Sequence, residues 1–296
     1  MKHIFALTMR NNRIFLRDKM TVFFSFLSSI ILVALYFLFI TKIYTDSIEQ
    51  DAAELFSMDA ANFLVYIQMI AGVLILNSLS LSLGVFSLAA RDFETRRVDN
   101  FLLTPTTNGR LLLSYFLSGF GVSFTLNSFT WLFSWTIIGL STGYWLAFSV
   151  VLFSLLILLL ASLISCSVMM LITSLVRSST ALGVINGILG TLIGFLAGIY
   201  IPLVNFGDGT IKVASLIPHT HLTIWLKRVV LESAFDALDA PDEIRTLIGD
   251  VFFSAKSIGF LGFDVDLPVM LIFCGAAGSL CLGAAVVVLR KRLRRR

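Results

Sequence analysis

The chain has 296 residues, of which 57% are hydrophobic and 14% are charged. So few polar side chains cannot cover the surface of a water-soluble protein of this length, which excludes soluble enzymes and soluble binding proteins. The composition instead predicts an all-α polytopic membrane protein in which residues 1–296 form a single transmembrane domain.

The net charge of +4 hides a segregation of positive and negative side chains along the sequence. There are 16 Lys or Arg and 4 Asp or Glu in residues 1–19, 91–110, 177 and 290–296. The corresponding numbers are 6 and 14 in residues 42–59 and 203–267. Because short cytoplasmic loops carry an excess of Lys and Arg, the split predicts that the first set, with both termini, is cytoplasmic. Charge arranged in this way indicates orientation in a bilayer and no nucleic-acid partner.

Residues 1–19 precede the first long apolar run and predict an interfacial helix. At 100° per residue, Lys2, Arg10, Arg13 and Arg17 share one narrow stripe, and apolar side chains occupy the remaining arc. An amphipathic helix of this kind lies in the plane of the membrane. We expect its arginines to reach anionic lipid headgroups. The alternative is a basic flank that only sets the orientation of the protein.

Six apolar runs are long enough to cross the roughly 30 Å hydrocarbon layer at about 1.5 Å per residue. They cover residues 20–41, 60–90, 111–140, 144–176, 181–202 and 267–289. The run at 60–90 exceeds one bilayer, so we expect it to tilt or to protrude. None of the six contains Asp, Glu, Lys, Arg or His, the groups that relay protons or attack bonds inside a membrane.

Two spans carry unusual side chains. The second span is rich in amides and hydroxyls, including Asn77 and Ser80, which must face protein or a cavity. In the fifth span, Gly190, Gly194 and Gly198 recur every fourth residue. Glycines at that spacing form a groove on one helix face, so we expect another helix to pack there, within this chain or across a dimer interface.

Residues 203–266, between the last two spans, contain two amphipathic helical patterns. Leu222, Leu226 and Val230 share one face of the first pattern, and the second begins at Pro241. Neither is long or apolar enough to span the bilayer. We expect both outer helices to lie on the outer leaflet, to dip into it, or to cover the spans as a lid.

The sequence has no pattern for catalysis, metal binding or cofactor binding. Cys166, Cys274 and Cys281 fall inside apolar runs without C-x-x-C spacing. His219 and His221 stand two residues apart, which points their rings in different directions on a helix and makes a poor metal clamp. The nucleotide-binding loop G-x-x-x-x-G-K-[ST] is missing. We therefore expect no enzyme activity and no cofactor on this chain, and energy for any uphill transport must come from another polypeptide.

A charged segment follows the second span and reads Asp92-Phe-Glu-Thr-Arg-Arg-Val-Asp-Asn-Phe-Leu-Leu-Thr-Pro105. Together with the order of the spans, this segment resembles the permease subunit of type-2 ATP-binding-cassette (ABC) exporters. In that family the loop carries Glu, a Gly two residues on, a hydrophobic pair and Ser/Thr-Pro. The matching residues here are Glu94, Asp99, Phe101, Leu102, Thr104 and Pro105. Arg96 stands where the family usually has Gly.

The resemblance implies one transmembrane half of a dimer, formed with a second copy or a paralogue in a bacterial-type cell membrane. A separate ABC ATPase subunit would bind ATP and Mg²⁺ and drive export. The second and fifth spans would line the substrate path, with Asn77, Ser80 and Asn186 as candidate residues. These spans offer polar groups but no charges, which suits an amphipathic or hydrophobic compound such as a drug, lipid or peptide. A charged glycan is the alternative cargo.

We expect residues 93–103 to form a short cytoplasmic coupling helix that docks into a groove of the ATPase. Its apolar face would be Phe93, Val98, Phe101 and Leu102, and its charges would be Glu94, Arg96, Arg97 and Asp99. The alternative is a solvated loop whose arginines only set the orientation. Two other functions stay open at this point: a membrane enzyme of lipid or cell-wall synthesis, and a non-transporting scaffold or receptor.

Overall fold

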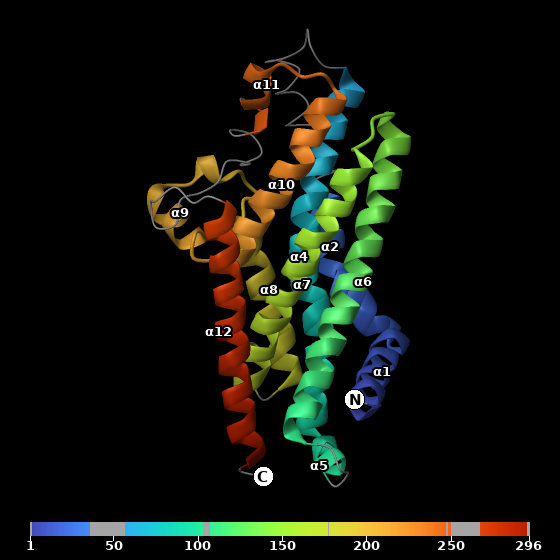
Figure 1. Ribbon diagram of the computed structural model, residues 1–296, viewed down its shortest axis with the longest axis vertical. Coiled ribbons are helices and arrows are strands. Elements are labelled where there is room, and N and C mark those ends of the chain that lie inside the picture. The colour runs from blue at the N-terminus through green and yellow to red at the C-terminus, as the bar shows by residue number, and fades with distance from the viewer. Residues whose placement is uncertain are drawn as a thin grey trace.

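The computed structural model describes residues 2–35, 57–102, 107–176, 178–246, 248–249 and 267–294, and most of these residues lie in helices. These ranges contain no strand. The helices are α1 (Lys2–Arg17), α2 (Lys19–Leu35), α4 (Met58–Glu94), α5 (Arg97–Leu102), α6 (Asn108–Thr142), α7 (Phe148–Leu175), α8 (Ser179–Leu196), α9 (Asp208–Ala214), α10 (Pro218–Ala237), α11 (Asp242–Thr246) and α12 (Leu267–Arg294) (Figure 1). A 3-10 turn at Leu203–Asn205 lies between α8 and α9.

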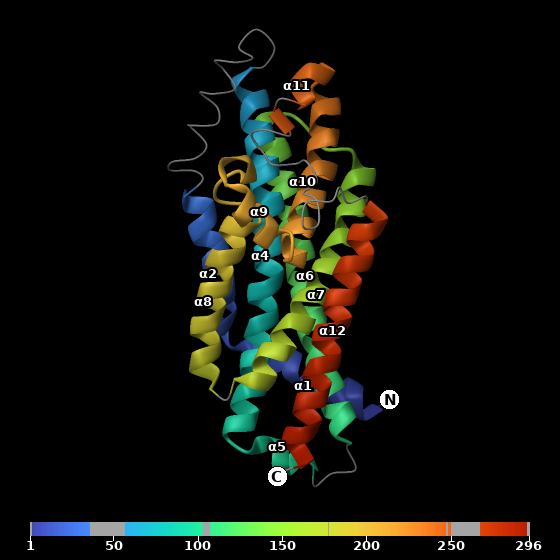
Figure 2. The same cartoon turned by 90° about the vertical axis from the view of Figure 1, so that its left-hand side faces the viewer.

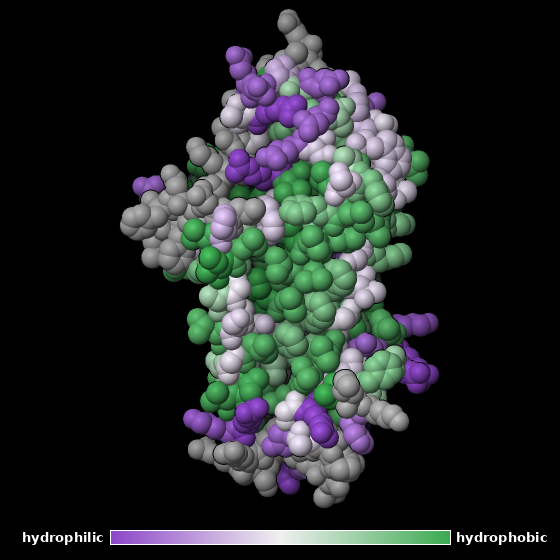
Figure 3. All heavy atoms as spheres, viewed as in Figure 1, coloured by the Kyte–Doolittle hydropathy of each residue, from purple (hydrophilic) through white to green (hydrophobic). Residues whose placement is uncertain are grey.

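Five of these helices are long and apolar enough to cross a membrane, and they coincide with five of the six predicted spans. They are α4, α6, α7, α8 and the Pro268–Lys291 part of α12. The first predicted span, residues 20–41, begins as α2, but residues 36–56 lie outside the described ranges. Apolar side chains form a broad band between two more polar ends (Figure 3). The predicted all-α class is therefore confirmed for the described part of the chain.

The two ends of the bundle differ in the segments that they carry. α5 and the C-terminus lie at one end, and α11 lies at the other (Figures 1 and 2). We call these the α5 end and the α11 end. The basic segments around Arg97 and Arg290 lie at the α5 end, whereas Asp242 and Glu243 of α11 lie at the other. The structure thus separates the two signs of charge in space as the sequence separates them along the chain.

Helix α4 is the centre of the fold. It packs against α2, α6, α7, α8 and α10, and its most apolar window is completely buried inside the chain. Its 37 residues extend over about 55 Å at 1.5 Å per residue, well beyond one hydrocarbon layer. Asn77 and Ser80, the polar side chains predicted to face protein or a cavity, are buried. A single rigid element therefore connects the α11 end to the α5 end.

Hydrogen bonds explain how α4 tolerates polar side chains in an apolar bundle. The amide of Asn127 on α6 donates to the Leu74 carbonyl at 2.8 Å and accepts from the Asn77 amide at 3.4 Å. The hydroxyls of Ser78 and Ser165 lie 2.8 Å apart and join α4 to α7. A buried amide or hydroxyl costs several kcal/mol without a partner, about 2 to 7, so these bonds favour this one register of the helices.

The connection between α6 and α7 is short, as the bounds of the predicted spans 111–140 and 144–176 imply. Helix α6 ends at Thr142, and Gly143 follows in the left-handed region with φ of 78°. Glycine carries no Cβ and therefore adopts this conformation without strain. Inside the hairpin, the Trp131 indole N–H donates to the Val151 carbonyl at 3.2 Å, which locks the two helices together.

Helix α8 departs from the predicted glycine groove. It ends at Leu196, and Gly198 follows the helix with φ of 63°, so Gly198 terminates the span and does not continue a helical stripe. A Cβ on Gly194 would meet the ring of Tyr200, which folds back from the next turn. No heavy atom lies within 4 Å of a Cβ built on Gly190. Among the described residues, the atoms near the three glycines therefore belong to no other α-helix, and the alternative of packing across a dimer interface stays a prediction.

Helix α10 is the first of the two predicted outer helices. It packs between α4 and α7 and contacts α8 and α12, so it is held against the spans. Its position relative to the outer leaflet stays a prediction. Leu222, Leu226 and Val230 are buried as the amphipathic pattern predicts. Lys227 is buried as well, and its ammonium group donates to the Gly198 carbonyl at 2.7 Å. Of the second outer helix, α11 is described only over Asp242–Thr246, and most of its predicted pattern lies outside the described ranges.

Candidate functional site

The α4–α5 turn forms the tip of the α5 end. Helix α4 continues through Glu94, and a new helix starts at Arg97. Between them Arg96 adopts φ of 55°, one of two left-handed non-glycine residues in the described ranges. The predicted continuous helix over residues 93–103 is therefore wrong: Phe93 and Glu94 belong to α4. The left-handed turn explains why a glycine suits the position that Arg96 occupies.

Arg96→Gly is expected to stabilise this turn. Left-handed backbone costs an L residue about 1 to 2 kcal/mol because its Cβ approaches the following carbonyl, and glycine lacks that atom. We expect the free energy of unfolding in detergent to rise by about 1 kcal/mol. Arg97→Gly, inside α5, is the matched control and should lower it by about the same amount. A loss of stability in both variants would contradict the left-handed assignment.

The faces of α5 differ from the predicted ones. Val98 is buried, and Phe93 on the last turn of α4 is buried beside the same core. These two side chains anchor α5 to its own bundle and are not available to a partner. The exposed residues of the turn are Glu94, Thr95, Arg96, Arg97 and Asn100. The surface that α5 offers to another protein is thus polar and basic, and the expected apolar docking face is wrong for Phe93 and Val98. The side chain of Leu102 lies outside the described residues.

A buried carboxylate stands directly before the turn. Asp92 has no exposed surface, and both of its oxygens bind Arg10 of α1, at 2.8 and 3.4 Å. The Tyr115 hydroxyl of α6 donates to the same carboxylate at 2.6 Å. Asp92 therefore joins α1, α4 and α6. The expectation that Arg10 reaches lipid headgroups is wrong, since Arg10 turns inward, whereas Arg13 and Arg17 are exposed.

Arg10 also contacts α5. Its guanidinium carbon lies 4.8 Å from the centre of the Phe101 ring, which is a cation–π arrangement. Phe101 is half-buried and packs against the main core. One arginine of the N-terminal helix therefore touches both the end of α4 and the short helix that follows it.

Glu94 binds the start of α8. Its carboxylate accepts hydrogen bonds from the backbone N–H and the hydroxyl of Ser179, at 3.0 and 2.9 Å. Ser179 is the first residue of α8, and a carboxylate at a helix N-terminus satisfies free N–H groups and the helix dipole. Glu94 thus caps α8 and links the α5 end of α4 to the start of the fifth predicted span.

The predicted substrate-path residues are mostly enclosed. Asn77 and Ser80 lie on the buried length of α4, where Asn77 holds α6 in place. Asn186 is half-buried on α8, and its carbonyl oxygen has no hydrogen-bond partner among the described residues. Their role toward a substrate stays a prediction.

His219 and His221 have separate partners. The Nε2 atom of His219 lies 2.9 Å from the Ser165 hydroxyl, and that of His221 lies 2.7 Å from the Ser215 carbonyl. In the described part of the chain, no group of three or more potential metal ligands occurs. The two rings therefore tie α10 to its surroundings.

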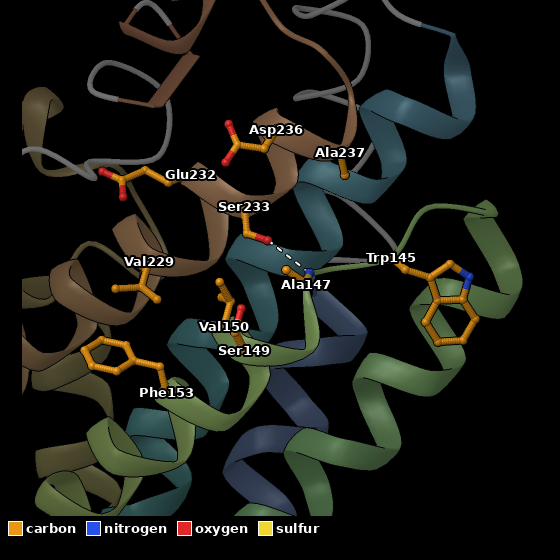
Figure 4. A pocket seen from close by; sticks show the side chains of 10 residues that line it. All are labelled: Trp145, Ala147, Ser149, Val150, Phe153, Val229, Glu232, Ser233, Asp236 and Ala237. Atoms are coloured by element: carbon orange, nitrogen blue, oxygen red, sulfur yellow. Dashed lines mark hydrogen bonds between the residues drawn. The ribbon is translucent and has the colours of Figure 1, made fainter.

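A cavity of about 600 Å³ opens between α7 and α10 toward the α11 end (Figure 4). Trp145, Val150, Phe153 and Val229 give it an apolar wall, and Glu232 and Asp236 project from α10 beside it. These two carboxylates pair with Arg228 and Arg245. A hollow with an apolar wall and a charged rim suits an amphipathic molecule better than a fully polar one.

A comparison with protein families gives the decisive match. The family model of ABC-2 family transporter proteins matches residues 40–289, which is most of the chain. The chain belongs to the ABC-2 transporter family. The protein is therefore an integral membrane permease component of an ABC transporter. A search of curated proteins gives no significant match.

Proposed function

We propose that this permease works with a separate ABC ATPase that docks on the exposed face of the α4–α5 turn and drives export. The observation that supports this proposal is the turn itself. It presents Arg96, Arg97 and Asn100 outward, while Val98 is held in the core. A docking element must be anchored on one side and free on the other in order to pass a rigid-body movement between subunits. The basic surface would face acidic groups on the ATPase.

Two connections would carry a movement of α5 into the membrane. Helix α4 continues without interruption to the α11 end, so a displacement of its last turn moves the whole rod. Glu94 transmits the same displacement to the start of α8 through Ser179. The two helices that the resemblance assigns to the substrate path are therefore linked at the docking site.

The proposed cargo is an amphipathic or hydrophobic compound such as a drug, lipid or peptide. Support comes from uncharged polar groups on α4 and α8 and from the cavity of Figure 4, whose wall is apolar. None of the five candidate spans has Asp, Glu, Lys, Arg or His in its central apolar run, which disfavours a strongly charged cargo.

Purification of the tagged permease from its native membrane tests the proposed function. We expect a second chain with a G-x-x-x-x-G-K-[ST] loop to co-purify and the complex to hydrolyse ATP. Replacing the loop lysine in that chain should abolish hydrolysis and leave the complex intact. Recovery of a permease that transports without any nucleotide-binding chain would contradict the proposal.

We further propose that the permease dimerises through α8. Its Gly183, Gly187 and Gly190 have open space around a Cβ position, and Val184 and Ile188 are exposed apolar neighbours. Small residues on an exposed membrane helix allow close approach of a second backbone. Gly187→Leu is expected to raise the dissociation constant of the dimer about tenfold, a change of about 1.4 kcal/mol, in mass photometry of detergent-solubilised protein.

Gly283→Leu on α12 is the matched control, since Gly283 is exposed and has equally open surroundings. It should leave the dimer fraction unchanged. If Gly283→Leu dissociates the dimer and Gly187→Leu does not, the interface lies on the α12 side.

We propose that the α5 end is cytoplasmic, because it holds the excess of Lys and Arg. In a variant with the native cysteines replaced by alanine, Glu232→Cys should react with an impermeant thiol reagent on sealed cells, and Gly109→Cys should react only after lysis. Both positions are exposed. Labelling of Gly109→Cys in intact cells would reverse the orientation.

A further inference from the structure

We infer that Arg10 is a positioning residue that sets the orientation of α5, with Asp92 as its buried anchor. This inference rests on the proposed docking of an ATPase at α5. It assigns the N-terminal helix α1 a part in coupling, beyond its expected contact with the membrane surface.

Helix α5 cannot hold its own orientation. It has six residues, whereas a helix needs about 12 to 15 residues to be even marginally stable alone in water. The reason is that forming the first turn loses more conformational entropy than its single hydrogen bond offsets. Its position must therefore come from tertiary contacts. Val98 enters the core, and Phe101, three residues on and therefore on the same face of the helix, lies beneath the guanidinium of Arg10. The second contact prevents α5 from rolling about the first.

The Arg10 guanidinium can orient Phe101 only if the guanidinium itself is held in place. Two hydrogen bonds to the carboxylate of Asp92 hold the guanidinium, which also donates to the side-chain oxygen of Asn11 at 2.9 Å. Tyr115 in turn fixes Asp92. Charge-assisted bonds to a fully buried carboxylate are among the stronger polar contacts in proteins, and the forked guanidinium binds with a defined plane. The plane of Arg10 is therefore fixed by α4 and α6 and presented to α5.

The arginines on the basic stripe of α1 lie in different environments, as Arg13, one turn beyond Arg10, shows. Its side chain is exposed, whereas the Arg10 side chain retains 26% exposure. The two arginines have the same chemistry and lie on the same helix, but only Arg10 contacts α5. Arg13 is thus a matched control for every effect of charge or of membrane attachment.

A purely structural ion pair is the competing explanation, and a double substitution separates the two. Arg10→Gln with Asp92→Asn removes both charges, so no uncompensated charge stays buried. If the pair serves only to neutralise Asp92, the double variant should behave like the wild type in every assay. If Arg10 orients α5, the double variant should regain thermal stability relative to Arg10→Gln but retain a disordered α5.

The experiment uses the full-length permease in lipid nanodiscs, with the native cysteines replaced by alanine and spin labels at Asn100 on α5 and Leu113 on α6, both exposed. We expect a narrow distance distribution in the otherwise unaltered protein and in Arg13→Met. Arg10→Met and the double variant should broaden it. In a titration with the co-purified ATPase, both should also weaken binding about tenfold relative to Arg13→Met.

The spin-label distance distribution tests the inference about Arg10, and the ATPase titration tests the proposed function. The distance distribution reports α5 without any ATPase, so an unchanged distribution in Arg10→Met overturns the positioning role even if the ATPase binds elsewhere. Broadening in Arg10→Met but not in the double variant also overturns it in favour of the structural pair. Failure of the wild type to bind any ATPase contradicts the proposed function and leaves the test of α5 orientation in place.

Discussion

Reversing the two exposed arginines of the turn, Arg96→Glu together with Arg97→Glu, is expected to abolish binding of the ATPase while the permease stays folded. Both side chains project from the α4–α5 turn. Like charges brought together at an interface cost several kcal/mol, so we expect the dissociation constant to rise at least 100-fold, or by about 3 kcal/mol. Titration of the ATPase onto nanodisc-embedded permease measures this change.

Arg13→Glu with Arg17→Glu is the matched control for net charge. These exposed arginines of α1 lie at the same end of the molecule and change the charge by the same amount. Long-range electrostatics alone would weaken binding in both double variants. Direct docking at the turn predicts a large effect in the first and a small one in the second, and equal losses would argue against the turn as the docking surface.

Asp92→Ala is expected to be the most destabilising single substitution at the α5 end. It leaves the guanidinium of Arg10 and the hydroxyl of Tyr115 without their shared acceptor. Breaking a buried charge pair by removing one partner costs about 3 to 5 kcal/mol, and the partial exposure of Arg10 places this case near about 3 kcal/mol. Unfolding followed by tryptophan fluorescence in detergent measures the change.

Asp59→Ala tests whether the effect is specific to burial. Asp59 is an exposed carboxylate in the first turn of the same helix, where its interaction with the helix dipole is worth less than about 1 kcal/mol. If Asp92→Ala were no more destabilising than Asp59→Ala, the Arg10–Asp92–Tyr115 cluster would not hold α1, α4 and α6 together.

The sequence predicts the membrane-crossing helices well because hydropathy depends only on local composition. The α4 span is an instance: its apolar run is unmistakable, and its amides and hydroxyls correctly imply a protein environment. The length of the run at 60–90 predicts that this helix tilts or protrudes, but the sequence does not reveal that the helix continues to Glu94. Charged residues normally mark the end of a span, so the sequence predicts that Asp92 lies in a solvated loop. Burial of Asp92 depends on Arg10, 82 positions away, and no local pattern encodes such a pairing.

The α4–α5 turn and helix α10 also depend on contacts between residues far apart in the sequence, which local patterns do not predict. Phe93 and Val98 are apolar residues in a charged segment, but whether such residues meet another subunit or their own core depends on tertiary packing. Arg96 is a partial exception, because a family position that usually holds glycine implies a left-handed residue, and φ of 55° agrees. In α10 the apolar stripe was predicted, yet the burial of Lys227 depends on the carbonyl of Gly198 at the end of α8.

A photoreactive amino acid placed at Asn100 tests the central claim most directly. Asn100 is exposed on α5, and its replacement leaves the buried anchors of the helix untouched. Irradiation of intact cells, followed by purification and mass spectrometry, should give a covalent adduct between the permease and a chain with a nucleotide-binding loop. The same amino acid at Glu232, at the α11 end, should give none. An adduct with a nucleotide-binding chain at Glu232 but not at Asn100 would contradict ATPase docking at α5.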